Sequence, residues 1–474
     1  MFLTHNMFAY HFIAVGDNIK RLPFLNRKRE ITKLTRALNS SESAFIVVYG
    51  RRRCGKSTLL QHITGKEDIY YLADQQESPL QIKSLAAEIS RQIPGFDQVV
   101  YPSWDVLFQA VQNQAQQGVT LILDEFPYLV QKSPDLPSIL QKQIDSKHSR
   151  VRLIICGSSQ RMMQGLVLDR TAPLYGRAME IMKLRPLEAG YLSDALDLDP
   201  IATVEAYSIW GGMPRYWELA KQFSSMETAC KELVLDRNGV LHDEPMRLLL
   251  DDMRGASQPH SLLGLIASGA NRVSEIAGRI GKPATSLTRP LANLIQLGYV
   301  RKDVPFGASS RSGKKTLYRL EDPFLQFWYR IVLPNYSLLE QDLIDAVYAA
   351  STQNLSMQTA EIWEELARWS TSHLEIAGRQ WKPAARWWGN GRNGKNMEID
   401  IIAESIDGQS ILFGEAKWQK KTNIKQILNK LTQQAENFPN IGKRKIVLAA
   451  WCRQHGIYPE HEHILTPKDV LSKQ

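Results

Sequence analysis

The chain has 474 residues, too many for one ordinary hydrophobic core, so about two to four domains are expected. Lys and Arg outnumber Asp and Glu, and the resulting net charge of +9 suits a polyanionic partner such as nucleic acid. No stretch approaches the roughly 18 apolar residues of a membrane helix, and the N-terminus lacks a signal-peptide layout, so we expect a cytoplasmic protein with no membrane span. The four cysteines form no C-x-x-C pair, so we expect no disulfide framework.

A phosphate-binding loop is predicted near the N-terminus. Residues 43–49 form an apolar run typical of a buried parallel strand, and a glycine-bounded loop and a helix-forming segment follow directly. Gly50 and Gly55 let the backbone turn its N–H groups towards phosphate oxygens. Lys56 would reach the β- and γ-phosphates, and the Ser57 hydroxyl would bind Mg²⁺. The residues expected to hold ATP are Gly50, Arg51, Arg52, Arg53, Cys54, Gly55, Lys56, Ser57 and Thr58.

Two further strands are expected to bring polar groups to the same edge of the sheet. The first, residues 119–123, ends in Asp124 and Glu125. Asp124 would hold Mg²⁺ through water, and Glu125 would orient or deprotonate the attacking water; the alternative is a pair of solvated loop acids. The second strand ends at Ser158 and Ser159, and we prefer Ser158 as the side chain that senses the γ-phosphate.

These features complete a resemblance to a known family. The motifs that carry it are Phe24-Leu25-Asn26-Arg27 with Glu30 and Leu34, the phosphate loop, Leu123-Asp124-Glu125, Gly157-Ser158, Pro173-Leu174-Tyr175-Gly176-Arg177 and Trp210-Gly211-Gly212-Met213-Pro214. From about residue 22 onwards the chain resembles the archaeal-type ATPases, a prokaryotic branch near the AAA+ and signal-transducing ATPases. The resemblance implies a winged helix and a C-terminal PD-(D/E)XK-like domain. It also implies that Arg177 contacts the γ-phosphate, within the chain or from a neighbour, with a surface ion pair as the alternative role.

A helical segment and a winged helix are predicted in the middle of the chain. Residues 187–252 carry apolar side chains at spacings of three and four, typical of an α-helical lid, and residues 258–320 read as three helices and a two-stranded wing. Pro290 lies inside the proposed recognition helix and should kink it. Direct DNA contact and packing against another domain therefore both stay open. The polar and basic side chains suited to phosphate are Ser286, Arg289 and Asn293 on the helix and Arg311, Lys314 and Lys315 in the wing loop.

A β-hairpin is predicted near the C-terminus. Two strand-like runs, 398–403 and 411–417, flank Asp407-Gly408, which is a strong signal for a two-residue turn. Counting outwards from that turn puts Asp400 opposite Glu415, and like charges in opposed positions destabilise a hairpin unless a cation lies between them. The two-residue period places Glu398, Asp400, Glu415 and Lys417 on one face, and Ile399, Ile401, Leu412 and Ala416 on the other.

An acidic helix, residues 359–369, is predicted before this hairpin, with Glu364 and Glu365 at the margins of its apolar face. In the PD-(D/E)XK pattern, which this segment resembles, the helical glutamate follows an aromatic or aliphatic residue, so Glu364 is preferred over Glu365. Asp400, Glu415 and Lys417 match the same pattern, although no proline precedes Asp400.

The residue types in this second site suit phosphodiester cleavage. The carboxylates of Asp400 and Glu415 are ligands that Mg²⁺ or Mn²⁺ prefers, and Lys417 would stabilise charge or position the nucleophile; an ion pair with Glu398 is the alternative for Lys417. Aromatic and basic side chains alternate before the hairpin and suit base stacking and phosphate contact, or form a core beside a solvated loop. They are Trp381, Arg386, Trp387, Trp388, Arg392 and Lys395.

The sequence therefore predicts an α/β multidomain protein that binds and hydrolyses ATP and binds or cleaves nucleic acid, with DNA favoured. The expected segments are an N-terminal extension (1–21), a P-loop ATPase core (22–186), a helical lid (187–252), a winged helix (253–322) and linker helices leading into a nuclease-like domain (323–474). The alternative is an ATP-driven switch that forms homo-oligomers and whose C-terminal domain only binds or scaffolds.

Overall fold

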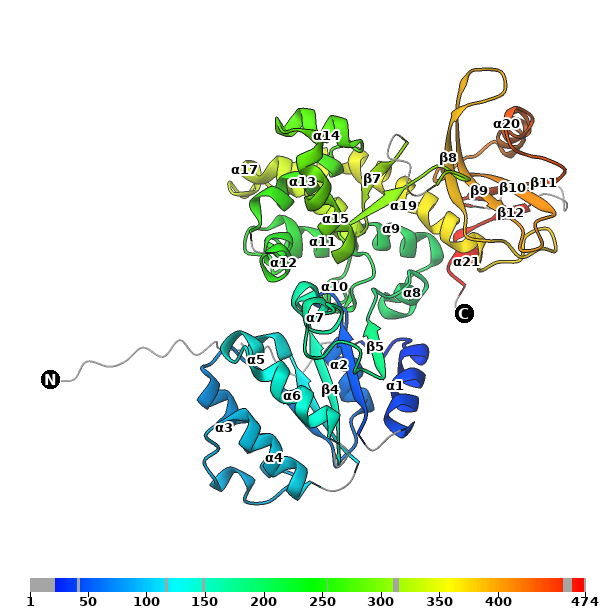
Figure 1. Cartoon of the computed structure of the whole chain (residues 1–474). Coiled ribbons are helices and arrows are strands. Elements are labelled where there is room, and N and C mark those ends of the chain that lie inside the picture. Colours follow the sequence, from blue (N-terminus) through cyan, green and yellow to red (C-terminus); the bar gives the residue numbers. More distant parts are fainter. Residues whose placement is uncertain are drawn as a thin grey trace.

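The computed structural model describes residues 22–40, 43–115, 118–146, 150–253, 255–309, 315–454 and 463–472. They form a lower α/β body, an upper helical body and a second α/β body beside it (Figure 1). The predicted extension 1–21 and the wing residues Arg311 and Lys314 lie outside the described residues. Within the described ranges, no helix is both long and apolar enough to cross a membrane.

The lower body is built on a five-stranded parallel sheet of order β2-β3-β4-β1-β5. Its strands are β1 (Phe45–Tyr49), β2 (Ile69–Leu72), β3 (Val119–Asp124), β4 (Val151–Gly157) and β5 (Glu180–Lys183). Its helices are α1 (Lys28–Ser40), α2 (Lys56–Ile63), α3 (Ser78–Ser90), the 3-10 turn Phe96–Gln98, α4 (Trp104–Gln114), α5 (Phe126–Lys132), α6 (Leu136–Asp145) and α7 (Gln160–Val167). The predicted parallel-sheet P-loop fold is confirmed.

Helices cover both faces of this sheet, because its central strands are apolar throughout and must be buried on both sides. All five residues of β1 are buried. Side chains from α3 to α7 pack on one face in one hydrophobic cluster, and those of α1, α2 and the following helical segment pack on the other. This second cluster is continuous with the core of the upper body, so the ATPase sheet and the helices above it share one apolar interior.

The upper body is helical apart from one two-stranded wing. Residues 187–252 form α8 (Gly190–Leu196), α9 (Pro200–Trp210), α10 (Pro214–Ala220), α11 (Met226–Cys230), a π-helical turn (Lys231–Leu235) and α12 (Glu244–Asp252). The winged-helix segment contains α13 (Ser257–Ala267), α14 (Val273–Ile280), a 3-10 turn (Ala284–Leu287), α15 (Thr288–Leu297), β6 (Val300–Asp303) and β7 (Leu317–Leu320). The linker contains α16 (Pro323–Phe327), a π-helical turn (Trp328–Val332), a 3-10 turn (Leu333–Asn335), α17 (Tyr336–Leu339) and α18 (Ile344–Ala350).

Pro290 does not kink the recognition helix, and that expectation is wrong. Helix α15 begins at Thr288, so the proline lies in its first turn. Backbone N–H groups of a first turn have no partner within the helix, and a proline there costs little. A 3-10 turn, Ala284–Leu287, lies directly before Thr288, so the irregular geometry precedes α15 instead of interrupting it.

The C-terminal body is a five-stranded mixed sheet of order β12-β11-β10-β9-β8 with helices on both faces. Its elements are α19 (Thr352–Thr371), β8 (Ala385–Asn390), β9 (Asn396–Glu404), β10 (Ser410–Lys417), α20 (Ile424–Asn437), β11 (Lys445–Cys452), β12 (His463–Leu465) and α21 (Pro467–Val470). Strands β8, β9 and β10 are antiparallel, and β10, β11 and β12 are parallel. Helix α19 packs on one face and α20 on the other, so each face of the hairpin has its own core.

Candidate functional sites

The phosphate loop joins β1 to α2. Gly55 is the N-cap of α2 at φ +90°, in the left-handed region that glycine adopts without strain. A Cβ at Gly50 would lie 2.5 Å from the carbonyl oxygen of Leu184, so only glycine fits there. The Lys56 ammonium donates to the carbonyl oxygens of Gly50 (3.0 Å) and Arg51 (3.1 Å), which holds it over the loop. The loop is therefore already curled as a phosphate cradle.

Four residues predicted for the ATP site form one hydrogen-bonded chain, in which the backbone N–H of Glu125 donates to Asp124 Oδ1 at 2.9 Å. The Ser57 hydroxyl donates to Asp124 Oδ2 at 2.6 Å. Glu125 follows at φ +53°, a strained conformation for a residue with a side chain, and its Oε2 accepts from both the backbone N–H (3.1 Å) and the hydroxyl (2.9 Å) of Ser158. Ser159 instead donates to the carbonyl oxygen of Asp251. Ser158 is therefore hydrogen-bonded to Glu125 and Ser159 is not, while the role of Ser158 as a γ-phosphate sensor stays a prediction.

A cavity of about 430 Å³ opens over the phosphate loop, a size typical of small-ligand sites. Loop residues 52–58 and Glu125 line one side, and the segment around Phe24 lines another. Sequence reasoning did not single out Arg215 and Glu218 of α10, which also line it. It also missed Tyr70, whose hydroxyl donates to Asp124 Oδ2 at 2.5 Å. Arg215 directly follows the Pro214 motif, which is a usable signal, whereas no pattern in the sequence marks Tyr70.

Each of the three arginines of the phosphate loop pairs with a carboxylate of the upper body. Arg51 Nη1 lies 2.6 Å from Asp322 Oδ2, and both side chains are less than 10% exposed. The other two pairs are Arg52 with Asp251 at 3.1 Å and Arg53 with Glu244 at 3.1 Å. The acidic partners lie far along the chain from the loop, on α12 and at the N-cap of α16. These side chains join the loop to the upper body, and Arg52 and Arg53 also line the cavity over the loop.

Asp252, the last residue of α12, contacts both α7 of the ATPase body and the segment that leads into β6. Asp252 accepts from the backbone N–H of Gln160 at 2.9 Å and from the Tyr299 hydroxyl at 2.8 Å. Burial raises the pKa of the Asp252 carboxyl, while these hydrogen bonds and the charge of Arg51 act in the opposite direction. One buried carboxylate therefore links the start of α7, just after Ser158, to the start of β6.

Arg177 lies away from its own phosphate loop. Its neighbour Met179 donates to the carbonyl oxygen of Phe45, the first residue of β1, whereas the loop follows the last residue of that strand. The guanidinium makes two hydrogen bonds to Asp145, at 2.8 and 2.9 Å, and one to the carbonyl oxygen of Pro173. The geometry matches the ion-pair alternative within one chain, and contact with a neighbouring copy stays a prediction.

The segment predicted to be a winged helix packs against both other bodies. In the wing, the Phe306 N–H donates to the carbonyl oxygen of Arg386 at 2.8 Å. On α15, Gln296 donates to Gln164 of the ATPase body at 2.7 Å. Ser286, Arg289 and Asn293 are exposed. Internal packing is therefore present at β6 and β7, and the outer face of α15 is exposed.

The predicted hairpin register is confirmed. Ile411 pairs with Glu404, and the ladder runs to Gly414 opposite Ile401, so one further step leads to Glu415 and Asp400. The predicted two-residue turn is wrong: the strands are closed at Ser405 and Ser410, and four residues form the turn. The observed turn is longer than the predicted one by one residue at each end, so the pairing of the strands is still the predicted one.

A β-bulge displaces Asp400 from the regular alternation. Between β8 and β9, Ala385 pairs with Ile402 and Trp387 with Ile399, so Asp400 and Ile401 together face the single residue Arg386. Ile399 consequently packs with the α20 side, not with Ile401 as expected. The Asp400 carboxylate turns to accept from the Ala416 N–H at 3.4 Å. Bulges often re-aim a side chain beside a functional site.

The structure brings Glu364, Asp400, Glu415 and Lys417 together from α19, β9 and β10. Lys417 Nζ lies 2.6 Å from Glu415 Oε1 and 3.9 Å from Asp400 Oδ2. Lys430 of α20 contacts the same Glu415 oxygen at 2.5 Å. Glu364 adjoins Asp400, whereas Glu365 turns away to pair with Arg301. The Glu398–Lys417 pair, the alternative considered for Lys417, does not form because Glu398 bonds Arg386.

Burial and mutual repulsion act on these acids. Burial raises the pKa of Glu364, and the charge of Asp400 adds to the rise. Burial also raises the pKa of Asp400, with a further contribution from Glu415, while Lys417 opposes it. Closely spaced buried carboxylates disfavour simultaneous ionisation, so a cation would stabilise their charged forms. Such perturbed groups are commoner at functional sites than elsewhere.

The tryptophans before the hairpin are mostly core. Trp381 and Trp387 are 1% and 8% exposed and pack on opposite faces of the sheet, so the core alternative holds for them.

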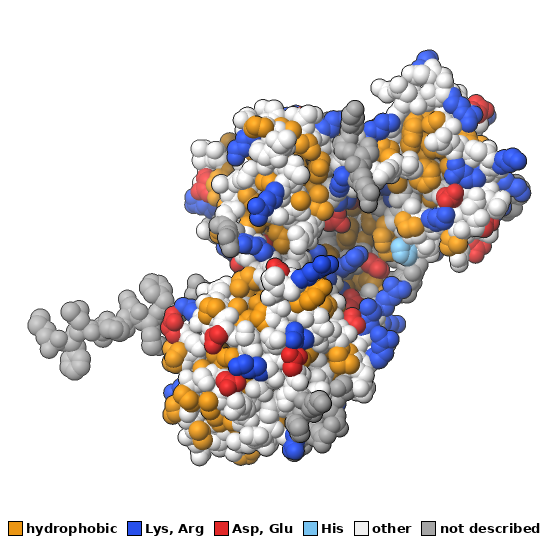
Figure 2. Space-filling view, in the orientation of Figure 1, with side chains coloured by type: hydrophobic (Ala, Val, Ile, Leu, Met, Phe, Trp, Pro, Cys, Tyr) orange, Lys and Arg blue, Asp and Glu red, His pale blue; other side chains and the backbone are white. Residues whose placement is uncertain are grey.

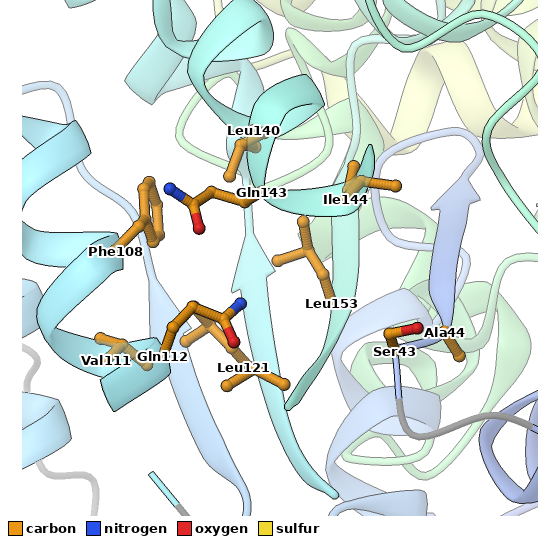
Figure 3. Close-up of a pocket in the computed structure, with 11 residues that line it drawn as sticks. Ser43, Ala44, Phe108, Val111, Gln112, Leu121, Leu140, Gln143, Ile144 and Leu153 are labelled. Carbon is orange, nitrogen blue, oxygen red and sulfur yellow. The ribbon is translucent and has the colours of Figure 1, made fainter. Parts of the chain in front are cut away.

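A second, smaller cavity of about 30 Å³ lies in the ATPase body beneath α4 and α6 (Figure 3). Apolar side chains such as Phe108, Leu121 and Leu153 dominate its wall, and its volume suits only a few waters, so it offers no ligand site.

Family comparisons match three parts of the chain. Residues 24–219 match a family described as an ATPase domain predominantly from Archaea. Residues 261–304 match the IclR helix-turn-helix domain, and residues 328–427 match archaeal and bacterial proteins of unknown function. The uncharacterized protein MJECL04 of Methanocaldococcus jannaschii is 29% identical over 427 residues, which cover 87% of this chain and 92% of that protein.

Solved structures share the ATPase fold. The Walker-type ATPase PABY2304 of Pyrococcus abyssi is 19% identical, with a TM-score of 0.52, and the match covers 65% of this chain and 96% of that one. The ORC2 protein of Aeropyrum pernix is 17% identical, covering 70% and 97% of the two chains, but its TM-score of 0.43 is too low to support a shared arrangement. The parallel sheet, the preformed phosphate loop and the family match together identify an archaeal-type P-loop ATPase domain in residues 24–219.

Proposed function

We propose that the protein binds and hydrolyses ATP at the loop 50–57. The observation that carries this proposal is the hydrogen-bonded chain from Ser57 through Asp124 and Glu125 to Ser158 beside the 430 Å³ cavity. Lys56 would neutralise the β- and γ-phosphates. Glu125, hydrogen-bonded to Ser158, would accept a proton from the attacking water. Mg²⁺ fits the oxygen donors of Ser57 and Asp124 and would neutralise charge on the phosphates.

The substitution Glu125→Gln tests whether Glu125 acts as the base. Glu125→Gln keeps the size of the side chain and its contact with Ser158 but removes the base, so we expect phosphate release to fall by at least about 100-fold while ATP still binds. Lys56→Ala is expected to lose binding as well. The matched control is Glu67→Gln, an exposed glutamate of the same body. Normal turnover in Glu125→Gln would assign the base to another residue.

A second proposed activity is Mg²⁺-dependent cleavage of nucleic acid, with DNA favoured, at Glu364, Asp400, Glu415 and Lys417. The observation that favours it is their convergence from three elements around a bulge that aims Asp400 at the group. Lys417 would stabilise charge that develops on a phosphate. DNA is favoured because of the net charge of +9 and the open face of the helix-turn-helix segment.

The donor set fits a hard divalent cation. Glu415 is 1% exposed, and its Oε2 is buried without a hydrogen-bond partner, so it offers a free acceptor. Within the described part of the chain, no group of three or more acidic, His or Cys side chains is spaced to hold a metal alone. Mg²⁺ commonly uses one or two carboxylates together with water and substrate phosphate, so Asp400 and Glu415 suffice. When bound, Mg²⁺ or Mn²⁺ would polarise the phosphate and activate water.

Cleavage assays distinguish this proposal from the alternative, in which the C-terminal body only binds or scaffolds. Full-length protein and Lys417→Ala are incubated with single-stranded DNA, duplex DNA and RNA in Mg²⁺. Cleavage by the unaltered protein and its loss in Lys417→Ala support a nuclease. Nucleotide-dependent homo-oligomers that persist in Asp400→Ala, with no bound metal in either protein, support the switch.

A further inference from the structure

A second lysine contacts the buried carboxylate of the group proposed for cleavage. Lys430, which no motif in the sequence marks, lies on α20, and its Nζ is 2.5 Å from Glu415 Oε1. Lys417 Nζ approaches the same oxygen at 2.6 Å. Glu415 lies two positions after Phe413, which packs with α20, so both side chains point to the face of the sheet that this helix covers. The contact between Lys430 and Glu415 therefore follows from the alternation of side chains along β10.

The two ammonium groups supply the positive charge that two buried carboxylates need. Glu415 is 1% exposed, and Lys417 Nζ also lies 3.9 Å from Asp400 Oδ2. Two ammonium groups thus balance two carboxylates, as buried charges require. A divalent cation that binds Asp400 and Glu415 would add two positive charges next to both lysines, and like charges at such short range repel strongly. Metal binding is therefore favoured if one ammonium moves away.

Lys430 is the lysine that is free to leave. Its side chain is 51% exposed, against 35% for Lys417. Among the described residues, Glu415 is the one acid that contacts Lys430, whereas Lys417 contacts both Glu415 and Asp400. An ion pair with an exposed partner is weak, because water hydrates the freed ammonium. Glu415 Oε2 is buried without a hydrogen-bond partner, so the same carboxylate has a second oxygen to offer a metal ion.

We propose that the ammonium of Lys430 takes the place of a cation at Glu415 until Mg²⁺ or Mn²⁺ binds there and displaces it. The inference rests on the metal site proposed at Asp400 and Glu415. It makes Lys430 a positioning residue, which pairs with the Glu415 carboxylate before the metal arrives and sets how tightly the metal binds. Lys and Arg side chains lie across the face of the C-terminal body seen at the upper right of Figure 2, so the freed ammonium joins a surface suited to a polyanion.

The affinity for Mn²⁺ tests this exchange without cleavage. It is measured by isothermal titration calorimetry on the full-length protein, with no nucleotide or nucleic acid. Lys430→Met keeps the length of the side chain and removes the competing charge, so we expect Mn²⁺ to bind about three- to tenfold more tightly. Lys430→Arg keeps a cation and should bind Mn²⁺ like the unaltered protein. The matched control is Lys425→Met, at an exposed lysine of the same helix, which should leave the affinity unchanged.

The variant Asp400→Ala separates failure of the inference from failure of the metal site. It removes a proposed ligand, leaves the partners Lys430 and Glu415 in place, and shows how much Mn²⁺ binds elsewhere, including the loop 50–57. If Asp400→Ala binds Mn²⁺ like the unaltered protein, the metal site fails and the inference fails with it. If Asp400→Ala loses Mn²⁺ while Lys430→Met binds it like Lys425→Met, the inference alone is overturned.

A crystal structure of the unaltered protein with Mn²⁺ decides the matter where Lys430→Met does not melt like the unaltered protein. We expect the ion at Asp400 and Glu415, with Lys430 Nζ more than about 4 Å from both oxygens of the Glu415 carboxylate, beyond the distance of an ion pair. A bound ion with Lys430 still in contact with Glu415 Oε1 would overturn the proposal and leave the metal site standing.

Discussion

At the scale of single residues, the buried carboxylate of Asp252 connects two of the bodies. Asp252 is 4% exposed and faces Tyr299, the Gln160 N–H and the charge of Arg51. Its pKa is raised, so the fold favours the protonated form relative to the unfolded chain. That contribution to stability is complete below the ordinary carboxyl pKa of about 4 and is lost as the pH rises through the raised value.

The variant Asp252→Asn lacks this pH dependence. We expect its melting temperature, relative to that of the unaltered protein, to rise between pH 4 and pH 7, because the variant avoids burying a charge at neutral pH. Differential scanning fluorimetry across this range measures the difference, with Asp97→Asn on the exposed surface as the control. A melting-temperature difference that is constant with pH, or that falls as pH rises, contradicts the account.

At the scale of elements, the phosphate loop and α16 are joined by the Arg51–Asp322 pair. Asp322 also caps α16 by accepting from the Phe324 N–H at 2.9 Å. A Cβ at Gly211 would lie 2.7 Å from Asp322 Oδ1, which explains a glycine at that point of the lid. The phosphate loop, the turn at Gly211 and α16 therefore meet at one buried ion pair. Removing one partner of such a pair leaves an uncompensated charge.

A double-mutant cycle measures this connection. Arg51→Met and Asp322→Asn are each expected to lower the free energy of unfolding by about 2–5 kcal/mol. The effect of the double variant should be smaller than the sum of the two single effects by at least about 1 kcal/mol. Asparagine keeps an oxygen for the α16 cap, so the cycle reports chiefly on the ion pair. The exposed Lys132–Glu77 pair is the control, with coupling of about 0–1 kcal/mol by urea denaturation. Additive effects at Arg51 and Asp322 would show that the pair does not join these elements.

The sequence predicts local features of both sites and misses the long-range ones. The phosphate loop depends on the order of strand, glycines and helix within about 20 residues, and the hairpin register depends on counting from a turn, so both can be read directly. The Arg51–Asp322 pair spans 271 positions, and no local pattern announces it. The bulge at Asp400 depends on how β8 pairs with β9, which alternation within one strand does not contain.

At the scale of the whole molecule, contacts run from the ATP site to the helix that carries Glu364. Asp322 precedes Pro323, whose carbonyl oxygen accepts from Gln358 of α19 at 3.1 Å. The same Gln358 amide donates to Ser208 of the lid, so α19 contacts both the lid and the linker. We predict that a change in the phosphate loop is transmitted to α19 through these contacts. If ATP changes the affinity for DNA, thermodynamic linkage requires DNA to change the affinity for ATP by the same factor.

The most direct test compares cleavage of DNA in Mg²⁺, with and without ATP, by the unaltered protein, Lys417→Ala and Lys56→Ala. The account predicts that the unaltered protein cleaves at a rate that ATP changes. Lys417→Ala should lose at least about 100-fold of that rate, and Lys56→Ala should cleave at a rate that ATP does not change. Indistinguishable behaviour of the unaltered protein and Lys417→Ala on every DNA and RNA substrate would contradict the nuclease claim.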